Sequence, residues 1–119
     1  MGRRVSEADR IAEFREVAEL FPDDPVVRFG LAGAYLEAGH AGDAAREYEA
    51  AIRLKPDYSA AYRGLGRALT RAGRLAEARE AFQRGLEVAT KTGDLQTRKE
   101  IAVFLRRLAE SADEGSEHG

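Results

Sequence analysis

Apolar residues recur along most of this chain at the three- and four-residue spacing that places them on one face of a helix. One such stripe precedes Gly73 and consists of Tyr62, Leu65, Gly66 and Leu69. A second stripe of the same kind begins at Ala78, and each stripe is typical of an amphipathic helix. Glycine adopts a positive φ without a steric penalty, so we expect Gly73 to end the first helix and turn the chain. The segment therefore predicts a helical hairpin.

The same pattern occurs twice, with a shift of 34 residues. The shift places Leu31 on Leu65, Tyr35 on Leu69, Gly39 on Gly73, Ala44 on Ala78, Tyr48 on Phe82 and Leu54 on Val88. A fixed period of this length indicates stacked hairpins, because one hairpin cannot bury both of its faces alone. Pro56 should end the second helix of the first copy, since proline cannot continue a helix.

Residues 30–56, with the sequence GLAGAYLEAGHAGDAAREYEAAIRLKP, resemble the tetratricopeptide repeat (TPR), and so do residues 59–90. The matching positions are Leu31-Ala32 and Leu65-Gly66, Tyr35 and Leu69, Ala44 and Ala78, Tyr48 and Phe82, Ala51 and Gly85, and Pro56. The resemblance implies an all-α fold: a right-handed superhelical stack of antiparallel helix pairs, a TPR-like α-solenoid of about six helices.

Three positions depart from the family pattern. Arg28 stands where the other repeat has the usual aromatic residue, Tyr62, and Ala41 replaces a larger side chain. Thr90 replaces the closing proline, so we expect the last hairpin to run on differently.

Both flanks of the repeats carry further helical stripes. Residues 5–21 should form an N-terminal flanking helix, and Gly93-Asp94 should cap a final helix that covers the open end of the core. The expected organisation is a flexible N-terminus at 1–4, the flanking helix at 5–21, repeats at 25–58 and 59–92, a capping helix at 94–110 and a disordered acidic tail at 111–119.

The amino-acid composition excludes several kinds of functional site. The formal net charge is -2 and there is no cysteine, which excludes thiolate zinc sites and cysteine nucleophiles. His40 and His118 are not spaced for metal ligation. We expect no enzyme, no cofactor and no metal. No window approaches the roughly 18 consecutive apolar residues of a membrane span, so a cytoplasmic protein without a membrane partner is expected.

One charge feature stands out, because no acidic residue lies between Asp57 and Glu77 while four arginines do: Arg63, Arg67, Arg71 and Arg74. On the first helix of each repeat, one face is left unused by the core stripe. The resemblance implies that this face lines a concave groove. The candidate partner-binding residues are Val26, Phe29, Gly33, Leu36, Arg63, Arg67, Thr70 and Arg71.

An apolar floor beside an arginine wall suits an extended, partly acidic peptide, because guanidinium groups bond carboxylates through two donors. The leading interpretation is therefore a non-catalytic scaffold that binds another protein. Some family members grip a C-terminal carboxylate with lysine and asparagine, but this chain contains no asparagine, so that clamp is not transferred. The structural alternative is that the arginines are solvated and Phe29 packs on the N-terminal helix.

Two other functions stay open. The terminal helices could join copies of the chain into a homo-oligomer, with Val103 opposite the core stripe of the last helix. The four arginines could bind nucleic acid weakly, although one patch supplies few phosphate contacts. The sequence does not identify the partner.

Overall fold

The computed structural model of the protein describes residues 6–118, with side chains described to residue 112. This part of the chain forms six helices and no strand. The helices are α1 (Glu7–Leu20), α2 (Pro25–Glu37), α3 (Ala41–Leu54), α4 (Ser59–Arg71), α5 (Leu75–Thr92) and α6 (Leu95–His118). The expected all-α fold of six helices is confirmed. The expected flexible segment at 1–4 lies outside the described residues.

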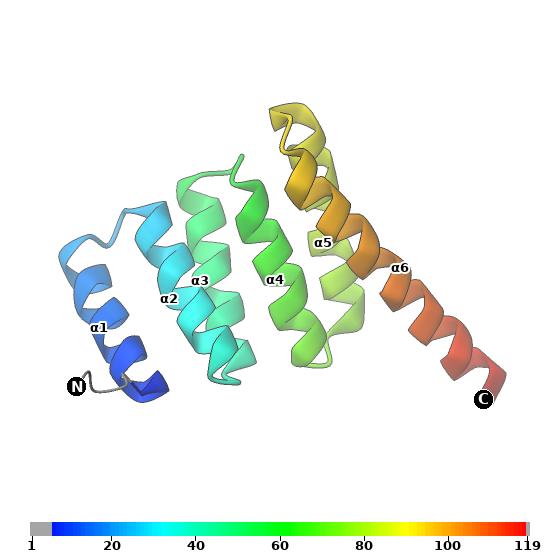
Figure 1. Ribbon diagram of the computed structural model, residues 1–119, viewed down its shortest axis with the longest axis horizontal. Coiled ribbons are helices and arrows are strands. Elements are labelled where there is room, and N and C mark those ends of the chain that lie inside the picture. The colour runs from blue at the N-terminus through cyan, green and yellow to red at the C-terminus, as the bar shows by residue number, and fades with distance from the viewer. Residues whose placement is uncertain (1–5, 119) are drawn as a thin grey trace, which may run out of the picture.

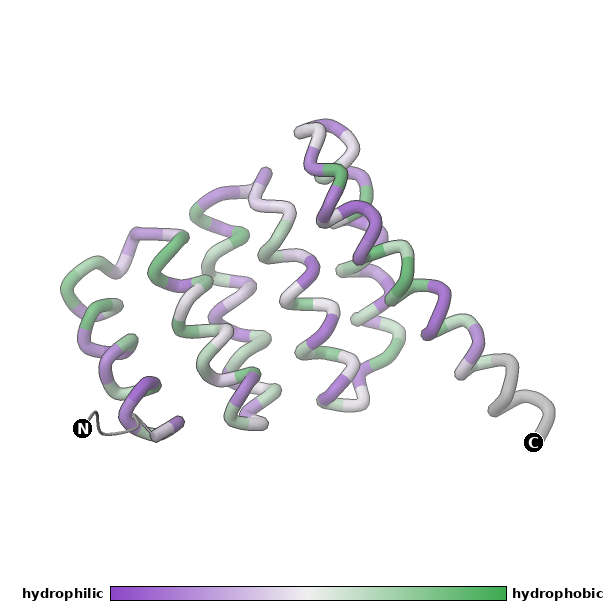
Figure 2. Tube along the Cα trace, in the orientation of Figure 1, coloured by the Kyte–Doolittle hydropathy of each residue, from purple (hydrophilic) through white to green (hydrophobic). Residues whose placement is uncertain are grey.

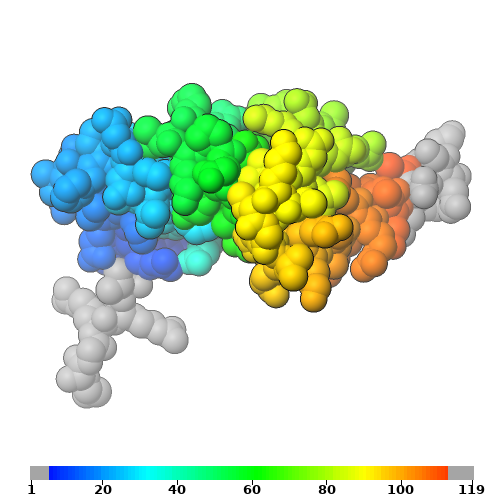
Figure 3. Space-filling model, turned by 90° about the horizontal axis from the view of Figure 1, so that it is seen from above, coloured from blue at the N-terminus to red at the C-terminus, as the bar shows by residue number. Residues whose placement is uncertain are grey.

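The helices stack antiparallel in chain order and form an elongated body of 50 × 33 × 26 Å (Figure 1). Seen from above, the segments follow one another from one end of the body to the other (Figure 3). Alternate helices are not equivalent. In the described part of the chain α2 contacts α4 and α4 contacts α6, whereas α3 contacts neither α1 nor α5. The layer of α2, α4 and α6 is therefore the inner, more closely spaced side of the stack.

The helix ends follow the turn chemistry of the sequence. Asp24 accepts hydrogen bonds from the Val26 and Val27 amides, and Pro25 occupies the first turn of α2. Gly39 and Gly73 follow the C-caps of α2 and α4 with φ of 82° and 77°. These values lie in the left-handed region that glycine adopts most easily, so the expected role of both glycines is confirmed.

The departure at Arg28 has a structural explanation. Tyr62 of α4 donates its hydroxyl to the Pro56 carbonyl at 2.9 Å. Arg28 of α2 donates Nε to the Pro22 carbonyl at 3.1 Å and pairs with Glu47 of α3 at 3.1 Å. The two side chains occupy equivalent repeat positions and satisfy the carbonyls of equivalent prolines. Arginine therefore replaces the aromatic residue without leaving that carbonyl unpaired.

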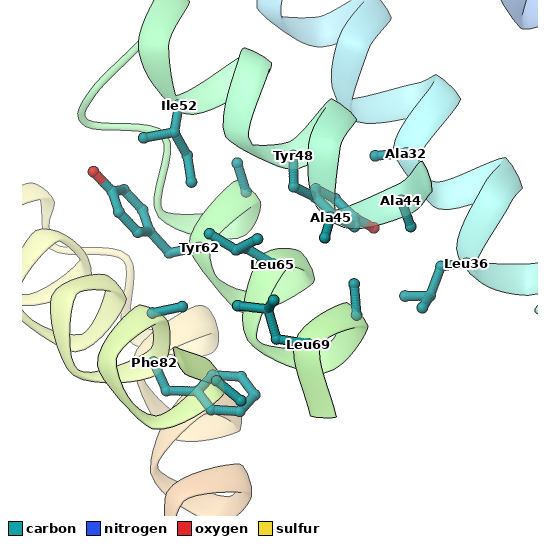
Figure 4. Packing of buried hydrophobic residues seen from close by; sticks show 14 of the residues in the cluster. Ala32, Leu36, Ala44, Ala45, Tyr48, Ile52, Tyr62, Leu65, Leu69 and Phe82 are labelled. Carbon is teal, nitrogen blue, oxygen red and sulfur yellow. The ribbon is translucent and has the colours of Figure 1, made fainter. Parts of the chain in front are cut away.

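Aromatic residues pack against glycine where one hairpin meets the next. A Cβ atom at Gly64 of α4 would lie 2.2 Å from the Tyr48 ring of α3, and one at Gly30 of α2 would lie 2.5 Å from the Phe14 ring of α1. Each glycine follows its aromatic residue by sixteen positions. Figure 4 shows Tyr48 among the buried side chains between the helices. The glycines let neighbouring helices approach closely enough to bury a whole ring.

The core lies along the middle of the stack. Its largest fully buried side chains are Phe82 and Ile101. Hydrophobic and hydrophilic positions alternate along the helices (Figure 2), and each helix from α2 to α6 contributes residues to this core. The amphipathic pattern predicted for the two repeats is thus confirmed.

The C-terminal part of the stack differs from the expectation in length. Without a closing proline, α5 continues to Thr92 and ends at Gly93, which has a φ of 74°. The predicted disorder at 111–119 is wrong for residues 111–118, because α6 continues to His118 rather than ending at 110. The acidic, polar composition of this segment agrees with the exposure of Ser111. It did not determine the backbone, since alanine, glutamate and serine all tolerate a helix and no proline interrupts this segment.

Candidate peptide-binding surface

The predicted binding residues lie on the inner layer and form one surface, which we call the α2–α4 face. It consists of Val26, Phe29 and Gly33 on α2 and Arg63, Arg67, Thr70 and Arg71 on α4. Val26 is 62% exposed, whereas Leu36 is only 4% exposed. The assignment of Leu36 to this surface is therefore wrong. The two helices meet at this end, where Arg71 Nη1 donates to the Leu36 carbonyl at 3.1 Å, and Leu36 belongs to the core.

Phe29 is half-buried on this face and contacts two tyrosines. Its ring stacks on Tyr58 with centroids 5.1 Å apart and meets the Tyr48 ring edge-on at 5.7 Å. Both of these aromatic partners follow Phe29 in the chain, Tyr48 in α3 and Tyr58 just before α4. The aromatic contacts hold the ring in place, so the apolar part of the face is preorganised.

The Tyr48 hydroxyl reaches this face from the outer layer. The ring passes Gly64, and its hydroxyl would lie 3.9 Å from a Cβ atom at Gly33. Burial raises the pKa of Tyr48, and the nearby charges of Arg67, Arg63 and Arg71 oppose this shift. Among the described residues the hydroxyl has no hydrogen-bond partner, and it is not one of the fully buried polar atoms, all of which have a partner. The hydroxyl is therefore a donor without a partner in this part of the chain, and the charge of Arg67 acts on it more strongly than that of any other arginine.

The four arginines do not form one free patch. Arg63 pairs with Glu100 of α6 at 2.8 Å, and Arg74 pairs with the exposed Glu77 on the far side of the turn. The Arg67 guanidinium lies 5.7 Å from the centroid of the Phe104 ring, and Arg71 bonds the Leu36 carbonyl. Among the described residues, neither Arg67 nor Arg71 forms an ion pair. These two arginines carry the uncompensated positive charge of the α2–α4 face.

Helix α6 is attached to α4 at its N-terminal end. Ser59 donates to Asp94 at 2.6 Å, and Asp94 also accepts the Thr97 amide at 3.1 Å. The hydrogen bond from Ser59 lowers the pKa of Asp94 the most, and the hydrogen bonds from Thr97 lower it further. The pKa of Glu100 is lowered chiefly by the hydrogen bond from Gln96 and also by Arg63 and Arg67. Both carboxylates stay ionised, so they hold α6 against α4 at neutral pH.

Sequence reasoning missed a cleft further along the same two helices. It has a volume of about 230 Å³ and is lined by Thr70, Phe82, Phe104, Arg107, Leu108 and Ser111. In Figure 1, α6 diverges from the lower end of α4, and the residues that line the cleft belong to α4, α5 and α6. The signals available in the sequence were the missing proline at Thr90, after which α5 continues to Thr92, and the Arg98 that stands where Gly64 stands one repeat earlier.

The described residues offer few groups for other chemistry. They contain no cluster of three or more histidine, aspartate or glutamate side chains arranged to hold a metal ion. His40 is exposed in the turn before α3 and stacks on Tyr35 at 6.1 Å. None of the helices is both long and apolar enough to cross a membrane. Val103, which was predicted to face a second copy, is half-buried on α6.

The sequence is similar to a family model and to known proteins. A family model for the tetratricopeptide repeat matches residues 29–93. The chain belongs to the tetratricopeptide-repeat family. Repeats of this family are protein-interaction modules. A TPR repeat-containing protein of Pseudomonas aeruginosa is 45% identical over 86 residues, which cover 72% of this chain and 82% of that relative.

Solved TPR structures resemble the whole stack. The solution structure of a protein from Bordetella parapertussis has a TM-score of 0.79 and 34% identity, and the match covers 91% of this chain and 94% of that one. The first TPR of Spaghetti, bound to an HSP90 peptide, also has a TM-score of 0.79, covering 90% of this chain and 80% of that one. At 22% identity the second likeness shows the fold alone.

Proposed function

We propose that this TPR protein binds an extended, partly acidic peptide segment of another protein on its α2–α4 face and has no catalytic role. The observation that carries the proposal is the Tyr48 hydroxyl, which reaches this face beside Gly33, feels the charge of Arg67 and has no hydrogen-bond partner among the described residues. A peptide carboxylate or carbonyl can accept from this hydroxyl while Arg67 supplies a charged donor beside it. The arrangement favours negative charge in the ligand.

The apolar half of the face adds the second requirement. Val26 is exposed, and Phe29 is fixed between two tyrosine rings. An apolar side chain of the ligand can bury itself here without first ordering flexible groups, which keeps the entropic cost of binding low. We therefore expect ligands in which an apolar residue lies close to aspartate or glutamate.

A structural neighbour provides a chemical parallel. The peptide bound to the first TPR of Spaghetti has the sequence SRMEEVD, which combines methionine and valine with three acidic residues. That ligand belongs to the other protein. The parallel supports a ligand of mixed apolar and acidic character for this chain, while the absence of asparagine argues for a different set of donors.

Selection from a random displayed library of dodecapeptides tests the proposal. Peptides recovered on the wild-type protein should be enriched in aspartate and glutamate and should contain an apolar residue nearby. Arg67→Glu should weaken the recovered peptides at least tenfold. Arg79→Glu makes the same charge reversal at an exposed position of α5 and should leave their binding unchanged.

The same two variants define the outcome that would contradict the proposal. Both variants should keep the wild-type helicity by circular dichroism, so that a loss of binding reports on the surface alone. Recovery of basic peptides, recovery of none, or equal binding to both variants would contradict the proposed function.

A further inference from the structure

The contact between α4 and α6 changes in character along its length. From the N-terminal end it consists of the hydrogen bond between Ser59 and Asp94, then the ion pair of Arg63 with Glu100, then the contact of Arg67 with Phe104. One helical turn further on, no such contact joins Thr70 of α4 to the described residues of α6, and the α4–α6 cleft opens instead.

The cleft is apolar inside and basic at its edge. Its wall is the stack of Phe82 on Phe104, whose ring centroids lie 5.3 Å apart at an interplanar angle of 8°. Leu108 lines it as well, and the Thr70 hydroxyl is already used as a donor to the Gly66 carbonyl at 2.7 Å. The guanidinium groups of Arg67 and Arg107 lie 5.7 and 6.0 Å from the centroid of the Phe104 ring.

Size and charge together define what fits. An apolar cavity of about 150 Å³ already accepts benzene, so a cleft of about 230 Å³ has room for one aromatic or large aliphatic side chain. Among the described residues neither Arg67 nor Arg107 forms an ion pair. An apolar group that enters the cleft therefore meets the cation of Arg107 in its lining, and an adjacent carboxylate in the ligand would compensate it.

We infer that the α4–α6 cleft is a second subsite for the partner peptide, which takes an aromatic or large aliphatic side chain that has a carboxylate next to it. This inference rests on the proposed function, because Arg67 of the α2–α4 face also lies beside the ring of Phe104, which lines the cleft. The cleft fixes the register of the peptide: one apolar side chain is held in it while the acidic part of the peptide lies along Arg67.

The probe for this subsite is N-acetyl-L-phenylalanine, which carries a benzyl group beside a carboxylate. Titrated into ¹⁵N-labelled protein, it should shift the backbone amides of Thr70, Phe104 and Leu108, with saturation on the order of 1 mM as expected for so small a ligand. Its uncharged amide should bind about threefold more weakly, since the exposed charge contacts are modest.

Two variants separate a specific cleft from general stickiness. Ser111→Phe places a ring at the edge of the cleft and should abolish the shifts. Ala102→Phe adds the same ring to an exposed position of α6 that does not line the cleft and should preserve them. Arg107→Gln should remove the preference for the acid over the amide and keep the shifts themselves, which serves as a check if Ser111→Phe fails to fold.

The outcomes distinguish the two proposals. If the displayed peptides bind and lose affinity with Arg67→Glu, but the probe shifts none of the three amides, the cleft inference fails while the proposed function stands. If the probe binds the cleft but no peptide does, the proposed function fails. Shifts of these amides with protein concentration alone would assign the cleft to a second copy of the chain and overturn the inference.

Discussion

Two junctions between hairpins in this protein are built differently. Where α3 meets α4, Tyr48 inserts against Gly64, sixteen residues later, and the helices close over the ring. Where α5 meets α6, the equivalent of Tyr48 is Phe82 and the equivalent of Gly64 is the exposed Arg98. Phe82 instead packs on Gly66 within its own repeat, where a Cβ atom would lie 2.3 Å away, and stacks on Phe104.

The comparison shows that aromatic residues at equivalent repeat positions use different packing partners at the two junctions. The first junction of α1 and α2 repeats the closed arrangement with Phe14 and Gly30. At the last junction the glycine is missing, α6 diverges from α4, and the α4–α6 cleft remains. The closed junctions pack a ring against a glycine, and the last junction leaves the cleft that we propose as a subsite.

The largest expected effect comes from filling the space beside Tyr48. Gly64→Ala places a methyl group 2.2 Å from the ring, and overpacking of this kind costs about 1–3 kcal/mol. Gly33→Ala, whose methyl group would lie 3.9 Å from the Tyr48 hydroxyl, should be neutral or stabilise the helix by up to about 1 kcal/mol. Urea denaturation measures both.

Position 98 provides the control for that prediction. Arg98→Ala changes an exposed residue at the open junction and should alter the free energy of unfolding by no more than about 0.5 kcal/mol. A cost at Arg98 that equals the cost at Gly64 would show that the two junctions are equivalent after all.

The next effect concerns the cap of α6. Asp94→Ala removes the acceptor of the Ser59 hydroxyl and of the Thr97 amide, and we expect a loss of about 1 kcal/mol. Asp94→Asn keeps a capping side chain and should lose less. Thermal unfolding of both variants measures the difference, and an unchanged stability of Asp94→Ala would contradict the role of this cap.

Acid should weaken the same end of the stack. Asp94 and Glu100 have lowered pKa values in the folded protein, so their contribution is complete above the unfolded pKa values of about 4. It is lost as the pH falls through the lower, folded pKa values. The wild type should therefore lose stability below about pH 5 more steeply than an Asp94→Asn, Glu100→Gln variant, and parallel curves in urea denaturation at several pH values would refute this.

The smallest effect should come from the ion pair of Arg63 and Glu100. Their side chains are 24% and 37% exposed, and a pair with this access to solvent contributes about 0.5 kcal/mol. A double-mutant cycle with Arg63→Gln and Glu100→Gln measures the coupling energy. The coupling should shrink in 1 M NaCl, whereas a value that is independent of salt would point to packing instead of charge.

The repeat made most of this fold predictable. The period of 34 residues located the hairpins, and the turn glycines and the stripe around Leu65 have their expected places. Periodicity could not reveal contacts between helices of different repeats. Leu36 was therefore assigned to the surface although α4 covers it, and Arg63 was taken as free although Glu100 neutralises it.

The sixteen-residue spacing of aromatic and glycine residues is visible in the sequence, but the sequence alone does not show that each ring packs on the glycine. Phe14 and Gly30, like Tyr48 and Gly64, are an ordinary pair of residues until the structure shows one ring over one glycine. For the acidic tail, composition was the only guide. It agrees with the exposure of Ser111, but it did not indicate the helix that continues to His118.

The central claim is that the α2–α4 face binds the peptide, and a matched pair of glycine variants tests it most directly. Gly33→Leu places a side chain over the Tyr48 hydroxyl, whereas Gly42→Leu adds the same side chain to α3 where nothing lies within 4 Å. Isothermal titration with the peptides recovered by display should show an affinity at least tenfold lower for Gly33→Leu and an unchanged affinity for Gly42→Leu. Equal affinities of the two variants would place the binding site elsewhere on the molecule and contradict the account.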